Sequence, residues 1–378
     1  MKKSKCIFFI DPQSMLNLAI YDYNLLSNID GDIYYFCSKH YDFKPIKGIR
    51  FIPVFAYNKI NNIVIKAISY MISYWLIMAY IIMIRPDVIH IQWFKIPTLD
   101  YFFFKFVKRL SKIKIIYTAH NILPHDSGDK YKKIFEKSYR SFDAIIVHTK
   151  ETKDKLEKLF ELNSDKIHII NHGLLKLEID KCEYQQKEKE FDKKYKTNGD
   201  KIIFTSLGEQ SLYKGIDILA EVWSTTPELN KSKYCELRII GKNANVDLSK
   251  LNNIHNVVID NRKIPNDEFF YLLTHSDVYL LPYRRISQSG ALLTAISEHI
   301  PILVTETGGL TEPFEVAKIG WKISKADYHE LKNMLVYLCN NKEEIKDLKN
   351  SKDVWKKVCD FYDWSRIGKK TQYLYEQL

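Results

Sequence analysis

Lys214 is the residue of this chain that most clearly suggests chemistry, because it lies in a loop bounded by Gly208 and Gly215. An apolar run ends at Gly208, a Lys214-Gly215 pair follows six residues later, and apolar residues then recur at helical spacing. This pattern predicts a strand, a loop that carries a cation, and a helix. Loops of this kind lie at the carboxyl end of the sheet in α/β domains, where ligands bind. Because a lysine ammonium is a point charge on a flexible stem, we predict that Lys214 binds phosphate.

Two further loops in the second half combine a strand, small residues and a helix. One places Ser289 and Gly290 at a helix start, where free N–H groups and the helix dipole favour an anion, with Arg284 nearby in sequence. An ordinary N-cap beside solvated arginines explains these residues equally well. The other loop is 305–312, in which Glu312 would complement the dipole or bond a ribose hydroxyl. Three such loops in one half of the chain favour a nucleotide-diphosphate site.

Histidines follow predicted strands in the first half. One strand runs into His120 and Asn121, and a histidine at that position could bond a pyrophosphate or a hydroxyl. His120 and His125 would also suit a metal, but no third ligand accompanies them at metal spacing, so we predict no metal site. His172 follows another strand and would either line the site or form a plain turn.

The elements that must position these residues alternate between short apolar strands and helical patterns. Such alternation predicts parallel sheets covered on both faces, and two such arrays predict two doubly wound α/β domains. The expected strands are 5–10, 33–37, 49–54, 88–91, 113–118, 144–148, 167–170, 202–207, 236–240, 257–259, 278–281 and 302–305. The expected organisation is a domain over 1–175, a charged connection over 176–200, a domain over 201–353, and terminal helices over 354–378 that pack back toward the first domain.

Composition narrows the class of protein. The six cysteines are scattered and form no C-x-x-C pair, which argues against a disulfide framework and for a reducing compartment. No signal peptide is expected, because the first apolar run ends after five residues. The net charge of +11 lies almost wholly in residues 1–175, with 26 Lys/Arg against 16 Asp/Glu. A basic half suggests an anionic partner, and no nucleic-acid-binding motif is present.

Two segments of the first half could meet a membrane. Residues 67–84 carry no charge, but strands on either side argue against a true span and for a buried or membrane-grazing helix. Residues 101–114 interleave five cations with aromatic residues and would suit anionic lipid on a helix. A sheet-covering helix with a solvated lysine edge fits the same pattern.

The ordered set of motifs resembles the GT-B glycosyltransferases of family 4, the group 1 transferases, across nearly the whole chain. Each motif is short, and their order and spacing carry the resemblance. The motifs are 85–91 (RPDVIHI), 118–125 (TAHNILPH), 169–173 (IINHG), 208–215, 264–268 (IPNDE), 289–295 (SGALLTA) and 301–312.

The resemblance implies two Rossmann-like domains facing across a cleft, with a sugar nucleotide on the C-terminal domain and the acceptor on the N-terminal one. It also implies retention of anomeric configuration and no metal or cofactor. Lys214 would stabilise the leaving phosphate, the N–H groups of Ser289, Gly290 and Ala291 would contact it, and His120 would reach the sugar or acceptor hydroxyl. Further implied positions are Gly208, Glu209, Arg262, Ile264, Arg284, Thr294 and Glu312 for the nucleotide sugar, and Gln13, Asn121, His125 and His172 for the acceptor.

The chain departs from the family pattern at several of these positions. Glu209 occupies the place of a phosphate-binding arginine, which Arg262, Arg284 or Arg285 would have to replace. Thr294 occupies the place of the second glutamate of an E-x7-E pair. We nevertheless expect a hexosyl-transferring enzyme of the cytoplasmic face that uses a UDP- or GDP-sugar and a glycan or lipid-linked acceptor in cell-surface polysaccharide synthesis. The alternatives are a sugar-nucleotide epimerase of the same fold and a non-catalytic binding protein.

Overall fold

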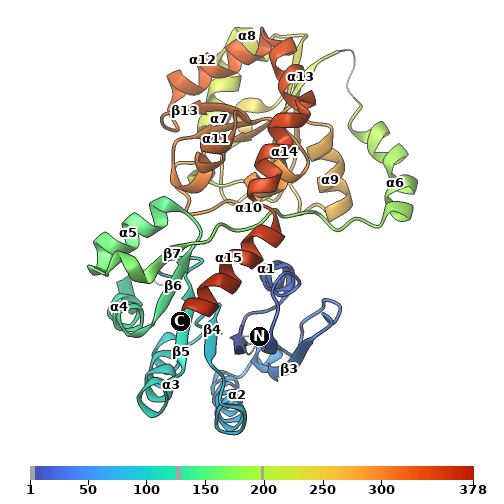
Figure 1. Ribbon diagram of the computed structural model, residues 1–378. Coiled ribbons are helices and arrows are strands. Elements are labelled where there is room, and N and C mark those ends of the chain that lie inside the picture. The colour runs from blue at the N-terminus through green and yellow to red at the C-terminus, as the bar shows by residue number, and fades with distance from the viewer. Residues whose placement is uncertain (1–4, 125–128, 197–199) are drawn as a thin grey trace. The chain divides into compact units, whose positions relative to one another are not determined.

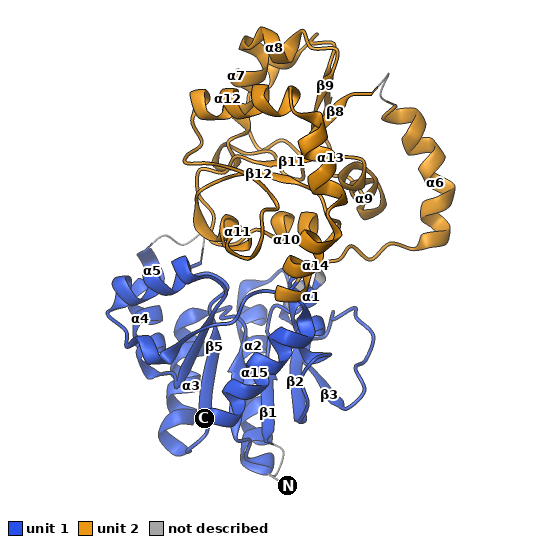
Figure 2. Ribbon diagram, turned by 45° about the horizontal axis from the view of Figure 1, so that its top comes forward, with its two compact units in different colours: residues 1–173, 362–378 blue, residues 174–361 orange. Residues whose placement is uncertain are grey.

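The computed structural model describes residues 5–124, 129–196 and 200–378 (Figure 1). The chain forms two compact units, one of residues 1–173 with 362–378 and one of residues 174–361 (Figure 2). Both units have the alternating α/β organisation expected from the sequence, and both sheets are parallel. His125 lies outside the described residues.

The first unit is built on a seven-stranded sheet in the order β3-β2-β1-β4-β5-β6-β7. Because the order reverses beside β1, the loops after β1 and β4 diverge there, which is where ligands bind in open α/β sheets. The strands are β1 Cys6–Ile10, β2 Asp32–Ser38, β3 Ile49–Phe55, β4 Val88–Ile91, β5 Lys114–Thr118, β6 Ala144–Val147 and β7 Ile167–Ile169.

Helices cover both faces of this sheet, since successive strand side chains point to opposite faces. Phe8 packs in a core with side chains of α2, α3, α4 and α5, whereas Phe9 packs in a second core with α1 and α15. The helices are α1 Leu16–Leu26, α2 Ile63–Ile84, α3 Pro97–Leu110, α4 Lys132–Ser141, α5 Lys150–Phe160 and α15 Trp364–Gln377.

The second unit is built on a six-stranded sheet in the order β10-β9-β8-β11-β12-β13, which reverses between β8 and β11. The strands are β8 Ile202–Leu207, β9 Cys235–Ile240, β10 Val257–Asp260, β11 Val278–Leu281, β12 Ile302–Thr305 and β13 Gly320–Ile323. The helices are α6 Lys181–Lys194, α7 Ile216–Thr225, α8 Pro227–Asn230, α9 Asn266–Thr274, α10 Gly290–Ser297, α11 Glu312–Val316, α12 Tyr328–Cys339, α13 Lys342–Asn350 and α14 Lys352–Phe361.

The boundaries of these elements and units differ from expectation in three places. Residues 176–200 are part of the second unit, where α6 packs on α9. Of the terminal helices, α14 packs on α10 and α11 within the second unit, and only α15 packs on α1 in the first. The basic segment 101–114 covers the end of α3 at Leu110 and the first residue of β5, Lys114, in agreement with the strand expected over 113–118. The short edge strand β13 was not predicted, since its four residues carry no alternating signal of their own.

Candidate functional site

Three loops meet at the carboxyl end of the second sheet, beside the reversal of strand order. Gly215 has φ 71°, and a Cβ there would lie 2.0 Å from the Pro282 carbonyl oxygen, so the loop after β8 contacts the loop after β11. The Arg284 N–H donates to the Tyr213 carbonyl at 2.8 Å across the same junction. A glycine at 215 therefore allows both the left-handed backbone and the close approach.

The loop after β12 joins the same group. Gly308 has φ 58°, and a Cβ there would lie 1.9 Å from the Ile286 carbonyl oxygen. The Gly309 N–H donates to the Ser287 carbonyl at 3.1 Å. We call residues 208–215, 282–289 and 308–310 the loop cluster. The convergence expected from the sequence is present in the structure.

Lys214 is the cation of the loop cluster. Its Nζ lies 3.9 Å from the position that a Cβ on Gly208 would take and 5.9 Å from the centre of the Tyr283 ring. Burial lowers the pKa of Lys214, and the nearby Glu209 opposes that shift. No described carboxylate lies within ion-pair distance of Lys214. The ammonium is thus partly desolvated and available to an anion, which strengthens its attraction for one.

The start of α10 supplies N–H groups to the loop cluster. Ser289 caps the helix, since its Oγ accepts from the Leu292 N–H at 3.2 Å. The N–H groups of Gly290 and Ala291 have no acceptor among the described residues, as expected for the first turn of a helix. Thr294 instead donates its hydroxyl to the Gly290 carbonyl at 3.0 Å and is buried. The helix start can therefore bind an anion, while Thr294 supports the helix turn.

Arg284 belongs to the framework of the loop cluster. Its guanidinium donates two hydrogen bonds of 2.6 Å to the Asp217 carboxylate in the first turn of α7. This bidentate pair holds the loop after β11 against the start of α7. Arg285 is exposed, and no carboxylate of the described chain pairs with it. The sequence makes Arg284 a candidate replacement for the missing phosphate-binding arginine. In the structure, however, its guanidinium is already paired with the Asp217 carboxylate.

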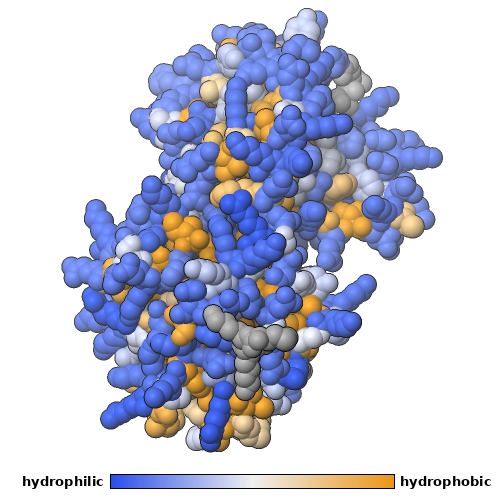
Figure 3. All heavy atoms as spheres, viewed as in Figure 1, coloured by the Kyte–Doolittle hydropathy of each residue, from blue (hydrophilic) through white to orange (hydrophobic). Residues whose placement is uncertain are grey.

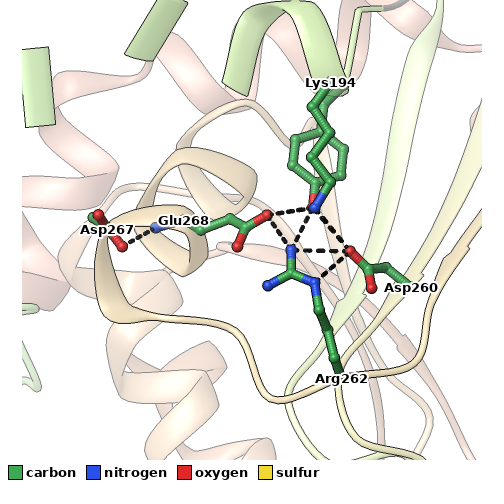
Figure 4. Close-up of polar contacts among 6 residues, drawn as sticks. Lys194, Asp260, Arg262, Asp267 and Glu268 are labelled. Atoms are coloured by element: carbon green, nitrogen blue, oxygen red, sulfur yellow. Dashed lines mark hydrogen bonds and ion pairs between the residues drawn. The ribbon is translucent and has the colours of Figure 1, made fainter. Parts of the chain in front are cut away.

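Arg262 is paired with two carboxylates, those of Asp260 and Glu268 (Figure 4). It follows β10, the edge strand, and its Nε donates to Asp260 at 3.0 Å while its Nη2 donates to Glu268. Lys194 of α6 binds the same two carboxylates at 3.0 and 2.9 Å. Burial favours the neutral form of Glu268, but hydrogen bonds from Arg262, Tyr195 and Lys194 hold its pKa at about 2. Arg262 is therefore held by ion pairs that join α6 to the sheet edge. Ile264 is half-buried in the segment between β10 and α9.

Glu312 begins α11, directly after the loop at 308–310. Its position agrees with the expected first helical turn, and a carboxylate there complements the dipole. Glu209, five residues before Lys214, is exposed, and the neighbouring Gln210 is buried and donates to the Gly208 carbonyl at 2.7 Å. The sequence gives no sign of this role for Gln210, because glutamine is common on surfaces and only its burial reveals the contact.

The first unit gathers a second set of polar side chains at the carboxyl end of its own sheet. His120 Nδ1 lies 3.1 Å from His148 Nε2, and His120 Nε2 lies 3.1 Å from Gln92 Oε1. Trp93 stacks on the His120 ring at 4.6 Å between centroids, and Tyr21 meets it edge-on at 4.8 Å. We call Gln92, His120, His148 and His172 the histidine cluster. It holds His120, which follows β5, in a fixed orientation.

The protonation state of the histidine cluster follows from counting protons. With the Gln92 oxygen toward His120, the bonds from Gln92 through His120 and His148 to the Ile170 carbonyl need three protons on two rings. Turning the amide over lets both rings stay neutral, because Gln92 then donates to His120. Its oxygen takes the place of the amide nitrogen that lies 3.0 Å from His90 Nε2 and accepts a hydrogen bond from it. Burial lowers the pKa of His120 well below its usual value and that of His148 to about 3. The neutral arrangement therefore holds near neutral pH.

Three further predicted residues of the first unit are His172, which belongs to this cluster, Asn121 and Gln13. His172 meets His148 and Trp364 edge-on, and its Nδ1 lies 2.7 Å from the Gly173 carbonyl oxygen. Asn121 is partly exposed beside His120. Gln13 follows β1, where its N–H donates to Asp11 at 2.7 Å and its amide oxygen lies 3.5 Å from Lys95 Nζ.

Sequence reasoning did not single out Gln92, Trp93 or His148 as site residues. Gln92 and His148 directly follow strands, and Trp93, like His120, is the second residue after one, so position after a strand was the available signal. Over residues 5–124, 129–196 and 200–378, no three His, Cys, Asp or Glu side chains are grouped so as to hold a metal ion.

Comparisons with known proteins agree with this architecture. Residues 32–174 match the family described as Glycosyltransferase Family 4, and residues 187–354 match Glycosyl transferases group 1. No curated protein matches the chain significantly by sequence.

Solved structures share the fold at low identity. Sucrose-phosphate synthase from Thermosynechococcus elongatus has 15% identity and a TM-score of 0.70, covering 99% of this chain and 98% of that one. The Anabaena protein HepE, solved with UDP and glucose, has 11% identity and a TM-score of 0.69, covering 99% and 100%. WaaG, a glycosyltransferase involved in lipopolysaccharide biosynthesis, has 15% identity and a TM-score of 0.65, covering 97% and 99%. The chain belongs to the family 4, group 1 glycosyltransferases and is a transferase of GT-B fold.

Proposed function

We propose that this enzyme transfers a hexosyl group from a nucleotide-diphosphate donor to a glycan or lipid-linked saccharide, with the donor on the second unit. The observation that carries the proposal is the loop cluster, which places an unpaired, partly buried Lys214 and the first-turn N–H groups of α10 at the reversal of strand order. Among the similar structures, HepE was solved with UDP-glucose as well as with UDP. A diphosphate sugar fits the charge and donor groups of the loop cluster.

The chemistry follows from where charge develops. As the glycosidic bond of the donor breaks, negative charge grows on the departing diphosphate. Lys214 and the N–H groups of Gly290 and Ala291 stabilise that charge, and a preorganised site of this kind contributes about 10²–10³-fold per donor group. Because these groups can carry the charge, we propose that the reaction proceeds without a metal ion. Retention of the anomeric configuration is proposed separately, on the family resemblance of the motifs.

The first unit supplies the contacts to the acceptor and the transferred sugar. His120 is held in one orientation by His148 and by stacking on Trp93, so a hydroxyl group that displaces Gln92 meets a neutral imidazole nitrogen. A neutral imidazole can accept a hydroxyl proton, which suits binding of a sugar hydroxyl. The setting we propose is cell-surface polysaccharide assembly at the cytoplasmic face.

The test combines donor binding and turnover. The full chain is screened with UDP- and GDP-sugars for nucleotide release, with and without EDTA, and for thermal stabilisation by UDP and GDP. Lys214→Ala should lower turnover by about 10²–10³-fold, while Lys250→Ala, an exposed lysine of the same unit, should not change it. Neither turnover nor stabilisation with any donor would refute the proposal. Stabilisation without turnover across donors and acceptors would identify a non-catalytic binding protein instead.

A further inference from the structure

The first unit exposes a large apolar surface on α2. This helix is long and apolar enough by length and composition to cross a membrane, yet only 28% of its most apolar stretch is buried. Ile63 is 79% exposed, Trp75 76% and Met83 67%. The other large apolar side chains that α2 exposes are Val64, Ile65, Ile68, Met71, Ile72, Leu76 and Ile82. Exposed apolar surface on this scale marks an interaction site.

The neighbouring helix α3 extends this surface. Phe102, Phe106 and Leu110 of α3 are exposed, while Phe103 stacks on Tyr74 of α2 at 4.2 Å between ring centroids. Figures 1 and 2 show the two helices side by side, and Figure 3 shows apolar side chains gathered at that end of the unit, with charged chains among them. We call the exposed residues of α2 and α3 the α2–α3 face.

A buried carboxyl group locks the two helices together. Asp100 of α3 accepts hydrogen bonds from the hydroxyls of Tyr70 and Tyr74 of α2 at 2.8 and 2.6 Å. Ser73 of α2 also donates to the Val54 carbonyl of β3 at 2.8 Å. The α2–α3 face is therefore a rigid part of the first unit.

Charge on this face has one sign. The segment that forms α2 contains no acidic residue, and the acidic residue of α3, Asp100, is buried. Lys105, Arg109 and Lys112 are exposed on or just after α3. Lys108 is paired with Asp143 at 2.6 Å and does not add to this set. Apolar side chains beside unpaired cations are typical of a helix that lies on an anionic membrane.

The topology decides between lying on a membrane and crossing it. The strands on either side of α2, β3 and β4, belong to the same parallel sheet with β2 and β1 between them. If α2 crossed a bilayer, β3 and β4 would lie on opposite sides of it and the sheet could not form. The inward side of α2 is buried in the core through Tyr70, Tyr74 and Ile77. The helix can therefore present only its outer side to lipid.

We propose that the α2–α3 face docks the first unit on a bilayer that contains anionic lipid. Apolar side chains such as Trp75 and Phe106 enter the boundary between head groups and acyl chains, and Lys105, Arg109 and Lys112 bind lipid phosphates. A second copy of the chain fits less well, because pairing this face with itself would bring its cations together. The proposal does not depend on the transferase activity.

Vesicle flotation of the full chain tests the proposal. The probes are vesicles of phosphatidylcholine alone and with 30 mol % phosphatidylglycerol. Trp75→Glu combined with Phe106→Glu should reduce partitioning into anionic vesicles by roughly tenfold or more, since each change puts a negative charge in the apolar boundary beside anionic lipid. Because both side chains are exposed, the variant should keep the wild-type Tm and circular dichroism. If it floats as well as the wild type, the proposal is wrong.

A charge variant tests the electrostatic part. Lys105→Ser with Arg109→Ser and Lys112→Ser should lower the partition coefficient for anionic vesicles roughly 100-fold, at about fivefold per cation, and reduce its dependence on salt. The matched control is Lys231→Ser with Lys233→Ser and Lys250→Ser, three exposed lysines of the second unit, which should float as the wild type does. Equal loss in both triple variants would overturn the proposal.

Insertion is measured separately from binding. Brominated lipid should quench fluorescence of the wild type more than that of Trp75→Phe. A concentration-dependent dimer that Trp75→Glu with Phe106→Glu abolishes, with no flotation of the wild type, would show a protein interface and refute the bilayer as the occupant. Hydrolysis of a soluble nucleotide sugar should be the same in this variant as in the wild type, so loss of docking is distinguished from loss of activity.

Discussion

Asp100 makes the stability of the first unit depend on pH. Its carboxyl group lies between α2 and α3 and accepts hydrogen bonds from Tyr70, Tyr74 and the Ile96 N–H. Burial raises the pKa of Asp100 to about 7, although those hydrogen bonds lower it in part. The same carboxyl group has a pKa of about 3.8 when the chain is unfolded.

The sign of the effect follows from linkage. Between pH 4 and 7 the folded protein holds a proton that the unfolded chain has lost, so stability falls as pH rises. The contribution is complete below the unfolded pKa and is lost by the time pH has risen through the folded one. Each unit of pKa difference corresponds to about 1.4 kcal/mol, so the total is about 4 kcal/mol and the part lost between pH 5 and 8 is about 3 kcal/mol.

The perturbation is Asp100→Asn, which removes the titration. The variant should be less stable than the wild type at pH 5, because the amide cannot satisfy all three donors, and this deficit should shrink by about 3 kcal/mol by pH 8. Hydrogen exchange of α2 and α3 amides in the full chain, corrected for the intrinsic rate at each pH, measures the change.

Asp154→Asn, at an exposed aspartate of α5, is the control. Asp11 and Asp22, whose pKa values burial also raises, are present in both proteins and cancel in the difference. A wild-type-minus-variant difference that stays constant from pH 5 to 8 would refute the reasoning.

The other predictions concern the site loops. Gly215→Ala should lower the free energy of unfolding by about 1–3 kcal/mol from the left-handed backbone alone and further from the contact with Pro282, so Tm should fall and UDP binding should weaken; an unchanged Tm by calorimetry would contradict the packing of these loops. Arg262→Met should lower Tm without changing the KM for the donor, because the guanidinium is held by carboxylates; a raised KM at unchanged Tm would return Arg262 to the site. His148→Phe should raise the KM for the acceptor or lower kcat while leaving UDP affinity unchanged, because it frees His120 to turn; unaltered kinetics would remove His148 as a positioning residue.

Local patterns were sufficient for much of the architecture. Apolar runs and helical spacing identified twelve of the strands later seen, with the edge strand β13 missed, and the small residues around Lys214, Ser289 and Gly308 marked the loops that converge. These features could be predicted because strand alternation, glycine in a left-handed turn and a capping serine are properties of neighbouring residues.

Contacts between distant residues decided what these residues can do. The sequence shows Arg262 and Arg284 as cations near glycine loops, and only the fold brings Glu268 and Asp217 against them and commits them to ion pairs. It shows a lone histidine at 120, and only the sheet brings Gln92 and His148 to its two nitrogens. The apolar sequence over 67–84 does not show by itself which of its side chains are buried in the fold and which are exposed. The sequence determined which elements form, because those preferences are local, and the tertiary structure decided which charges stay unpaired and which apolar side of α2 stays uncovered, because pairing and burial depend on residues far away in the chain.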